Sequence, residues 1–375
     1  MLTIDGSYGE GGGQVLRTSL ALAAITGQPV RIAHIRAGRR KPGLRPQHLT
    51  CVRAAARVCQ ARLEGARLNA QTVTFQPGSA PQAGKYTFDV AQAAKGGSAG
   101  SVGLILQTVL LPLALADGTS QLTLRGGTHV AWSPPYDYLK RVYLPALARA
   151  GIQVKVNIQK WGWYPQGGGV VKASVEGIAG DRPSAKGSQP QAKFSTDHAT
   201  RTTQHEPAAK ETATPWSASG LDLRQRGDLL RVRGVSASSN LPKHIRVRQE
   251  RAALQVLRAN GVNARIEVID APSKGKGTVV FLWAESENAV AGFTSLGELG
   301  KPAEQVAEDA AQDLLAYLAG GAALDRYMAD QMLLPLALAR GASQFTTEAV
   351  TQHLFTNAWV VNQFLPGRVR VEGKV

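Results

Sequence analysis

The sequence predicts an α+β fold in which three similar β-α-β-α-β-β units form a large domain that carries a smaller inserted α/β domain. The first observation behind this prediction is an internal repeat. Residues 110–123, LLPLALADGTSQLT, and residues 333–346, LLPLALARGASQFT, are identical at eleven of fourteen positions, and LALAAITG at 20–27 is a shorter echo. The second observation is that an apolar helix, a glycine and strand-like residues follow in the same order at all three places. Chance similarity between Leu- and Ala-rich helices is the alternative, and the length of the first match argues against it.

Each repeat is predicted to continue in the same way. A glycine ends the apolar helix, at Gly27, Gly118 and Gly341, as is common at helix C-caps. A strand, a second helix and further strands follow. The strands after the glycines cover 29–35, 121–124 and 344–347, the second helices cover 46–59, 134–151 and 351–365, and the closing strands include 72–75, 152–158 and 368–371.

The spacing of the repeats indicates an insertion, because the second and third copies lie much farther apart than the first and second. Residues 181–216 contain no Ile, Leu, Val, Met or Tyr, so we expect a flexible loop there. The chain then becomes regular again. A strand at 228–235, a helix at 242–261 and strands at 264–270 and 277–286 are predicted to form the small domain.

These patterns predict three segments. Residues 1–180 hold repeats one and two, residues 181–283 hold the loop and the inserted domain, and residues 284–375 hold repeat three. Arg and Lys are frequent in 224–251, which is compatible with a solvated helix face and equally with a nucleic-acid surface.

Composition narrows the range of functions. The 375 residues carry a formal net charge of +16, spread along the chain, which favours a polyanionic partner over a role in solubility alone. Cys51 and Cys59 lie on one predicted helix, about 12 Å apart along its axis, too far for a disulfide. The apolar run 102–116 is too short to span a bilayer and predicts a buried helix. Without the pattern of a signal peptide, these features predict a cytoplasmic protein with no membrane partner.

The first candidate site is the glycine-rich stretch DGSYGEGGGQVLR, residues 5–17, between a predicted strand and a helix. It lacks the Lys and Ser/Thr of a P-loop. Its glycines would still allow backbone N–H groups at the helix N-terminus to face an anion. Glu10 could carry Mg²⁺ beside a phosphate, and Arg17 lies further along the same helix. Glycines that only form a tight turn are the structural alternative.

A second candidate site is IRAGRRKPGLRPQHL, residues 35–49, where five basic side chains surround turn-forming residues. Guanidinium groups match the geometry of phosphate oxygens, so the loop is predicted to bind an anion rather than to be merely exposed. The five basic residues are Arg36, Arg39, Arg40, Lys41 and Arg45.

His353 begins the last predicted helix, in TQHLFTN. The helix dipole at this end would favour a neutral imidazole, which is a nucleophile. A single histidine is more often structural, so the residue pattern alone does not decide its role.

The motifs together resemble the RNA 3′-terminal phosphate cyclase family. They are DGSYGEGGGQVLR, IRAGRRKPGLRPQHL, GGSAGSVGLILQTVLLP, GGTHVAWSPPYDYL, WYPQGGG, NLPKHIRVRQ, RYMADQMLLPLAL and HLFTN, in order along nearly the whole chain. Residues 181–216 and the stretch AQAAKGG depart from the family pattern without touching a motif. The resemblance implies three repeats with an inserted domain, in agreement with the repeat analysis.

The resemblance also implies an activity and a site. ATP would adenylylate His353, AMP would pass to an RNA 3′-phosphate, and the vicinal 2′-OH would close a 2′,3′-cyclic phosphate and release AMP. Glu10 would hold Mg²⁺ or Mn²⁺, and either Arg39 or Arg40 would point inward. The implied ATP contacts are Gln107, Tyr327, Met328, Ala329, Asp330, Gln331, Arg17 and Gln47, and the implied phosphate or RNA contacts are Arg36, Arg39, Arg40 and Arg45.

Two other functions share parts of this pattern. A non-catalytic relative that acts as an RNA-binding scaffold in ribosome assembly would be expected to lack the histidine. An enolpyruvyl transferase shares repeated α/β units but needs neither QHLFTN nor a basic inserted domain. The sequence does not decide whether the subunit forms a homodimer.

Overall fold

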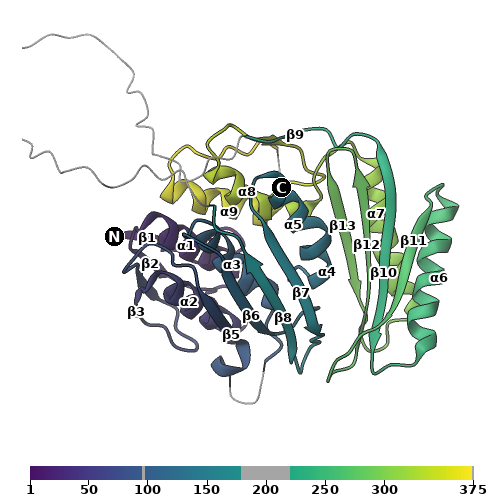
Figure 1. Ribbon diagram of the computed structural model, residues 1–375, viewed down its shortest axis with the longest axis horizontal. Helices are drawn as coiled ribbons and strands as arrows, with labels where there is room; N and C mark the ends of the chain where they lie inside the picture. Colours follow the sequence, from purple (N-terminus) through teal and green to yellow (C-terminus); the bar gives the residue numbers. More distant parts are fainter. Residues whose placement is uncertain (95–97, 179–219, 374–375) are drawn as a thin grey trace, which may run out of the picture.

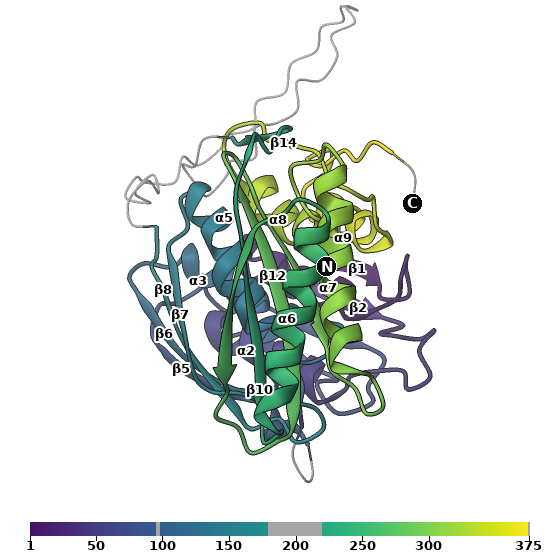
Figure 2. The same ribbon diagram turned by 90° about the vertical axis from the view of Figure 1, so that its right-hand side faces the viewer.

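Two four-stranded sheets of identical topology lie on opposite sides of a layer of helices (Figure 2), and a third four-stranded sheet stands at the right of Figure 1. The computed structural model describes residues 1–94, 98–178 and 220–373. The first two predicted repeats correspond to one sheet each. Repeat one comprises β1 (Leu2–Asp5), α1 (Gly13–Thr26), β2 (Val30–Ala33), α2 (Pro46–Cys59), β3 (Arg62–Glu64) and β4 (Val73–Gln76). Repeat two comprises β5 (Lys85–Asp89), α3 (Val102–Ala114), β6 (Ser120–Gly126), α4 (Tyr136–Tyr138), α5 (Leu144–Arg149), β7 (Val154–Lys160) and β8 (Gly169–Val175).

The repeat is visible in the strand order. The sheets run β1-β2-β4-β3 and β5-β6-β8-β7, and in each the first pair is parallel and the others antiparallel. Short irregular turns complete repeat two, a 3₁₀ turn at Val90–Ala93 and a π turn at Leu139–Tyr143 between α4 and α5. The structure therefore confirms the predicted α+β class.

The helices of different repeats pack against each other to form the core. Helix α1 contacts α2 and α3, and it also contacts α9 (Gln352–Phe364) of the third repeat. Nearly every residue of α3 is buried, which explains why its sequence is apolar all round. Cys51 and Cys59 are free and buried on α2. Among the described residues, no helix is long and apolar enough to cross a membrane.

The third repeat is smaller than predicted and is split along the chain. It consists of β9 (Asp222–Leu223), α8 (Arg326–Leu338), β14 (Gln344–Phe345) and α9, and β9 pairs in parallel with β14 as β1 does with β2. Since β9 precedes the small unit, the insertion lies inside repeat three and not before it. Residues 368–371, predicted as a strand, form no strand, because the Asn362 side chain bonds both the N–H and the C=O of Val369.

The small unit extends beyond its predicted end at residue 283. Its sheet has the order β11 (Ala264–Asp270), β10 (Leu229–Ser239), β12 (Gly277–Ser286) and β13 (Val290–Leu296), and β12 runs through that boundary. Helix α6 (Lys243–Ala259) packs on α7 (Ala303–Ala319), so the unit extends to the end of α7. The predicted loop at 181–216 lies outside the described residues.

Burial on both faces explains the long apolar run of β12. Leu282 and Ala284 belong to the hydrophobic cluster with α6 and α7, whereas Phe281 and Trp283 belong to the core of the large body. A central strand covered on both sides favours continuous apolar residues over alternation. The small unit is thus joined to the large body through its sheet.

One of the three predicted glycine caps is confirmed. Gly27 is the C-cap of α1 and has a positive φ of 71°. Helices α3 and α8 end earlier, with Leu115 and Ala339 as their C-caps. Gly118 and Gly341 therefore lie in the turns that follow these helices. The early ends have a local cause, since Pro112 in α3 and Pro335 in α8 each lack the N–H that would bond a carbonyl of the preceding turn.

Replacing Leu282 with Ala should lower the free energy of unfolding by about 2–5 kcal/mol, because the fully buried side chain would leave a cavity. Urea denaturation measures this loss. Leu299→Ala is the matched control, since Leu299 is fully exposed, and it should change stability by less than about 0.5 kcal/mol. Equal effects of the two substitutions would contradict the packing described for the small unit.

Candidate active site

The glycine turn brings α1 next to the last helix of the chain. Gly9 and Gly11 have φ values of 61° and 60°, a conformation that favours glycine. A Cβ atom on Gly9 would lie 2.2 Å from Oγ1 of Thr356 on α9, so only glycine fits there. The N-cap of α1, Gly12, offers no side chain to the first N–H groups of the helix. These groups are free of side-chain capping and suited to an anion.

Glu10 lies between two cationic groups at this turn. Its Oε2 is 2.8 Å from Nδ1 of His353, and its Oε1 contacts Nη2 of Arg39. The backbone N–H of Glu10 donates to Oγ1 of Thr356 at 3.3 Å. The first repeat, the basic loop and the third repeat therefore meet at one carboxylate.

The Glu10–His353 pair changes the protonation of both residues. It lowers the pKa of Glu10 and raises the pKa of His353. This direction runs against the prediction that the helix dipole keeps His353 neutral, because the adjacent Glu10 carboxylate favours the charged ring. Since Glu10 faces Nδ1, a neutral ring would keep its proton on Nδ1 and present the Nε2 lone pair.

The basic loop contributes its arginines unequally. Arg39 contacts Glu10 and is the member of the Arg39/Arg40 pair that faces the glycine turn. Arg40 is exposed. Arg36 donates to the carbonyls of Lys41 and Gly43 at 2.7 and 3.1 Å, so it stabilises the loop itself. Arg45 donates to the Asn69 side chain at 2.9 Å at the start of α2.

Arg17 and His48 converge on the start of α1. A Cβ on Gly13 would lie 2.7 Å from Nη1 of Arg17 and 2.6 Å from Nε2 of His48. Burial, together with Arg17 and two other arginines, lowers the pKa of His48 to about 3. Nδ1 of His48 accepts a bond from the Arg45 N–H at 3.3 Å. A neutral His48 beside a cationic Arg17 leaves the start of α1 electropositive.

All three predicted glutamines make contacts between repeats. Oε1 of Gln47 accepts a bond from the N–H of Ser101, the N-cap of α3, at 2.7 Å. Nε2 of Gln107 on α3 donates to Oε1 of Gln331 on α8 at 2.5 Å. Gln331 in turn donates to the carbonyl of Tyr327 at 2.6 Å. The Gln107–Gln331 pair therefore brings the repeat-two and repeat-three motifs together.

The YMADQ run divides into two groups. Met328 and Ala329 are fully buried in the core, so their side chains can only support a nucleotide site from behind. Tyr327 is about half-exposed and lies edge-on to Tyr138. Burial raises the pKa of Asp330 to about 6, while His353 and Arg17 oppose this shift. Asp330 is thus electrostatically linked to both cations of the site.

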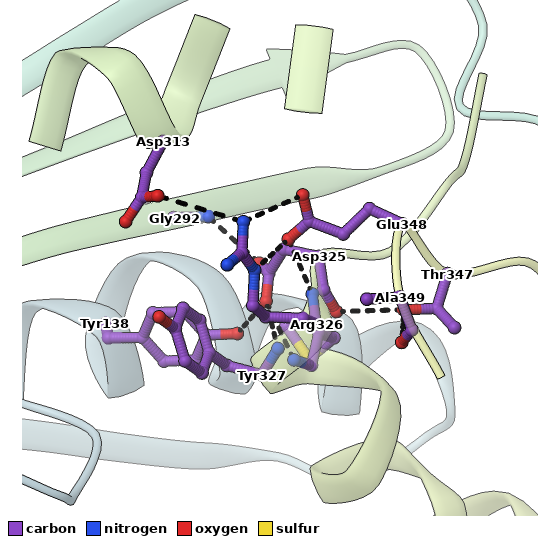
Figure 3. A network of polar contacts seen from close by, with 10 residues as sticks. Tyr138, Gly292, Asp313, Asp325, Arg326, Tyr327, Thr347, Glu348 and Ala349 are labelled. Carbon is purple, nitrogen blue, oxygen red and sulfur yellow. Dashed lines mark hydrogen bonds and ion pairs between the residues drawn. The ribbon is translucent and has the colours of Figure 1, made fainter. Parts of the chain in front are cut away.

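The start of α8 is fixed by a buried polar network (Figure 3). Asp325 is the N-cap, and its carboxylate accepts bonds from the N–H groups of Tyr327 and Met328. It also accepts bonds from the Tyr138 hydroxyl at 2.8 Å and from the Gly292 N–H at 3.0 Å. Burial raises the pKa of Asp325 to about 6, and these hydrogen bonds oppose the rise. One carboxylate therefore connects repeat two, the small unit and α8.

Asn357 of HLFTN has a role that the sequence analysis did not predict. The Thr18 hydroxyl on α1 donates to Oδ1 of Asn357 at 2.7 Å. Nδ2 of Asn357 donates to the carbonyl of Asp330 at 2.7 Å, so Asn357 holds α1, α8 and α9 together. An asparagine inside an apolar helix face was the available signal, because a buried amide needs partners.

A metal ion fits this site only together with phosphate. Among the described residues, no three His, Cys, Asp or Glu side chains form a group that could hold a metal. Mg²⁺ at nucleotide sites commonly uses one or two carboxylates and completes its shell with phosphate oxygens and water. Glu10, beside the uncapped start of α1, suits that arrangement.

Replacing Glu10 with Gln should lower the pKa of His353 toward its ordinary value, because Glu10 is the main cause of the rise. The raised pKa means that the pair stabilises the fold below the ordinary histidine pKa, and that this contribution disappears as the pH rises through the raised value. NMR titration of the ring measures the change. Asp5→Asn is the control, since Asp5 contacts His34 instead. An unchanged pKa in Glu10→Gln would contradict the pairing.

Replacing Tyr138 with Phe should lower the free energy of unfolding by about 1–3 kcal/mol, because the buried Asp325 would lose a partner. Chemical denaturation measures the loss. Tyr164→Phe removes the same hydroxyl from a side chain that is 78% exposed and should be nearly neutral. If the two variants are equally stable, the Tyr138–Asp325 hydrogen bond does not contribute to the free energy of unfolding.

Comparison with known proteins agrees with these motifs. The family model described as RNA 3′-terminal phosphate cyclase matches residues 8–371. A protein of that name from Nostoc punctiforme is 47% identical over 371 residues, covering 99% of this chain and 96% of the relative. Its namesake from Methylococcus capsulatus is 48% identical, covering 99% and 93%. The one from Methanopyrus kandleri is 40% identical, covering 100% and 96%. With its site geometry and matches over nearly its whole length, the chain belongs to the RNA 3′-terminal phosphate cyclase family.

Proposed function

We propose that the protein uses ATP to convert an RNA 3′-terminal phosphate into a 2′,3′-cyclic phosphodiester, with adenylyl-histidine and RNA-adenylate intermediates. The family makes it an ATP-dependent enzyme of the ligase type. The observation that carries the detailed mechanism is the pairing of His353 Nδ1 with Glu10 at 2.8 Å. This contact leaves Nε2 on the side of the ring away from the carboxylate, where the α-phosphate of ATP would approach.

In the first step, the Nε2 lone pair of His353 attacks the α-phosphorus of ATP. The Nε2–phosphorus bond forms, the bond from phosphorus to the bridging oxygen breaks, and pyrophosphate leaves with the electron pair. The imidazole becomes cationic, and Glu10 at Nδ1 stabilises this charge. The free enzyme must first release the proton on Nε2, which the raised pKa of His353 makes dependent on pH.

In the second step, an oxygen of the RNA 3′-phosphate attacks the adenylyl phosphorus, and His353 leaves. In the third step, the neighbouring 2′-OH attacks the activated 3′-phosphorus, loses its proton and expels AMP. A phosphate monoester lacks a good leaving group, and adenylylation provides one. The 2′-OH is already beside the phosphorus, and such proximity can lower a barrier by about 7–11 kcal/mol in the best cases.

The described side chains suggest where ATP lies. Arg17, Arg39 and the uncapped start of α1 would bind its phosphates, and Glu10 would hold Mg²⁺ or Mn²⁺ with them. A bound metal ion would neutralise charge on the phosphate oxygens. The adenosine would lie near Tyr327 and the Gln107–Gln331 pair. Asp330 would influence both cations from behind the site.

The presence of His353 in this geometry supports an enzyme over a non-catalytic scaffold of the same fold. The family match also argues against an enolpyruvyl transferase, which was predicted as an alternative because it has repeated α/β units of related topology. RNA with a 3′-phosphate end is therefore the proposed polyanionic partner of this basic chain.

Replacing His353 with Asn should abolish covalent labelling by ATP radiolabelled at the α-phosphate, because the amide cannot attack phosphorus. The adduct of the natural protein should be labile in acid and stable in alkali, as a phosphoramidate is. RNA that already carries a 3′-adenylylated phosphate bypasses the first steps, so the variant should retain some ring closure on it.

His244→Asn is the control for this experiment, since His244 is exposed on α6, and it should label normally. His48 provides the decisive comparison, because PQHL at 46–49 echoes TQHL at 351–354. Loss of label in His48→Asn, with label retained in His353→Asn, would place the nucleophile on α2 and overturn the proposal.

A further inference from the structure

The sheets of repeats one and two have the same topology but differently charged outer faces. On the sheet β5-β6-β8-β7, cross-strand partners place the polar residues of each strand on one exposed side. We call this side the basic sheet face. Its basic residues are Lys85, Arg125, Lys155, Lys160 and Lys172. Asp89 is the acidic residue in the same rows, and Glu176 just beyond β8 pairs with Lys155 at 3.5 Å.

The equivalent face of repeat one has no such excess of charge. On β1-β2-β4-β3 the outward side carries Arg31 and Arg62 together with Asp5 and Glu64. The two faces are related by the repeat, so the fold alone does not require the basic residues of the second. The basic sheet face also lies on the outside of the body, with α3 and α5 behind it (Figure 2).

Two aromatic side chains project at one end of the basic sheet face. Trp132, in the segment after β6, is 99% exposed, and Tyr164, between β7 and β8, is 78% exposed. The segments are linked by a bridge between His129 and Trp163. Trp132 has a positive φ of 62°, which is a costly conformation for a bulky residue. A strained backbone that holds an indole in water indicates a role in binding.

The same end of the sheet adjoins the phosphate site. Ser101 bridges Gly127 at the end of β6, and its N–H donates to Gln47 on the first turn of α2, next to His48. On the other side, a Cβ on Gly167 in the β7–β8 connection would lie 2.4 Å from the carbonyl of Ser98. Arg125 and Lys160 share a cross-strand row near this end of the sheet. The basic sheet face is therefore continuous with the surface around the phosphate site.

We propose that the basic sheet face, with Trp132 and Tyr164 at its end, binds the single-stranded RNA segment that precedes the 3′-terminal nucleotide. Single-stranded RNA is bound by aromatic rings that stack on bases and by basic side chains that follow the phosphates. The basic sheet face offers both, and its aromatic end is the one that adjoins the phosphate site. This inference rests on the proposed function for the identity of the RNA end.

The test compares two RNAs with a 3′-phosphate, a dinucleotide and an oligonucleotide of roughly 12 nucleotides. In the Trp132→Ala/Tyr164→Ala variant, the KM for the long RNA should rise about 10-fold or more, since stacking on each ring contributes substantially. The KM for the dinucleotide and the rate of adenylylation by ATP should not change. Loss of adenylylation in this variant would assign the rings to ATP and overturn the proposal.

The charge contribution is tested with matched variants of the two repeats. The double substitution Arg125→Glu/Lys172→Glu should weaken binding of the long RNA. It should also reduce the slope of log affinity against log salt concentration by the amount expected for the loss of about two phosphate contacts. Arg31→Glu/Arg62→Glu changes the net charge equally on the other sheet and should bind almost normally. Equal weakening by both variants would show a general charge effect and overturn the proposal.

Binding by fluorescence anisotropy separates this inference from the proposed function. If the natural protein binds long RNA through Trp132 and Tyr164 but forms no cyclic end, the basic sheet face stands and the proposed reaction fails. If it cyclises both RNAs with equal KM values and the aromatic variant behaves identically, the reaction stands and the basic sheet face is overturned.

Discussion

The contact between Glu10 and α9 is the constraint on which the rest of the site depends. Glu10 pairs with His353, and its N–H bonds Thr356, a residue 346 positions away in the sequence. The carboxylate favours a proton on Nδ1, the ring nitrogen that it contacts, and the backbone bond ties the glycine turn before α1 to α9. Both require Gly9, where any side chain would collide with Thr356. The glycine turn thus works by allowing close approach as well as by exposing N–H groups.

A second layer of buried polar groups holds the helices that surround this contact. Asn357 links α1 to α8, Asp325 links α8 to repeat two and to the small unit, and Gln107 links α3 to α8. Buried polar groups of this kind are costly unless every partner is present, so they favour one arrangement of the repeats over others. The site therefore lies where three copies of one structural unit are forced into a single relative orientation.

The sequence was most informative where local periodicity and turn chemistry determine structure. The helix 46–59 and the strands 264–270 and 277–286 were predicted with their observed bounds. The end of the small unit was missed, because β13 and α7 follow without any change in composition. His353 was identified as a candidate from its motif. Its protonation was not, because the partner that controls it, Glu10, lies at the other end of the chain.

The separation of β9 from the rest of repeat three has a consequence for how the chain folds. The parallel β9–β14 pair can form only after the two ends of the small unit have come together. A folded small unit shortens the effective loop between them and so reduces the entropic cost of closure. We therefore expect this ladder to form late, after the local pairings of the first two sheets, because contacts of high sequence separation are gained slowly. A nascent chain would hold the glycine turn long before α9 is synthesised to complete it.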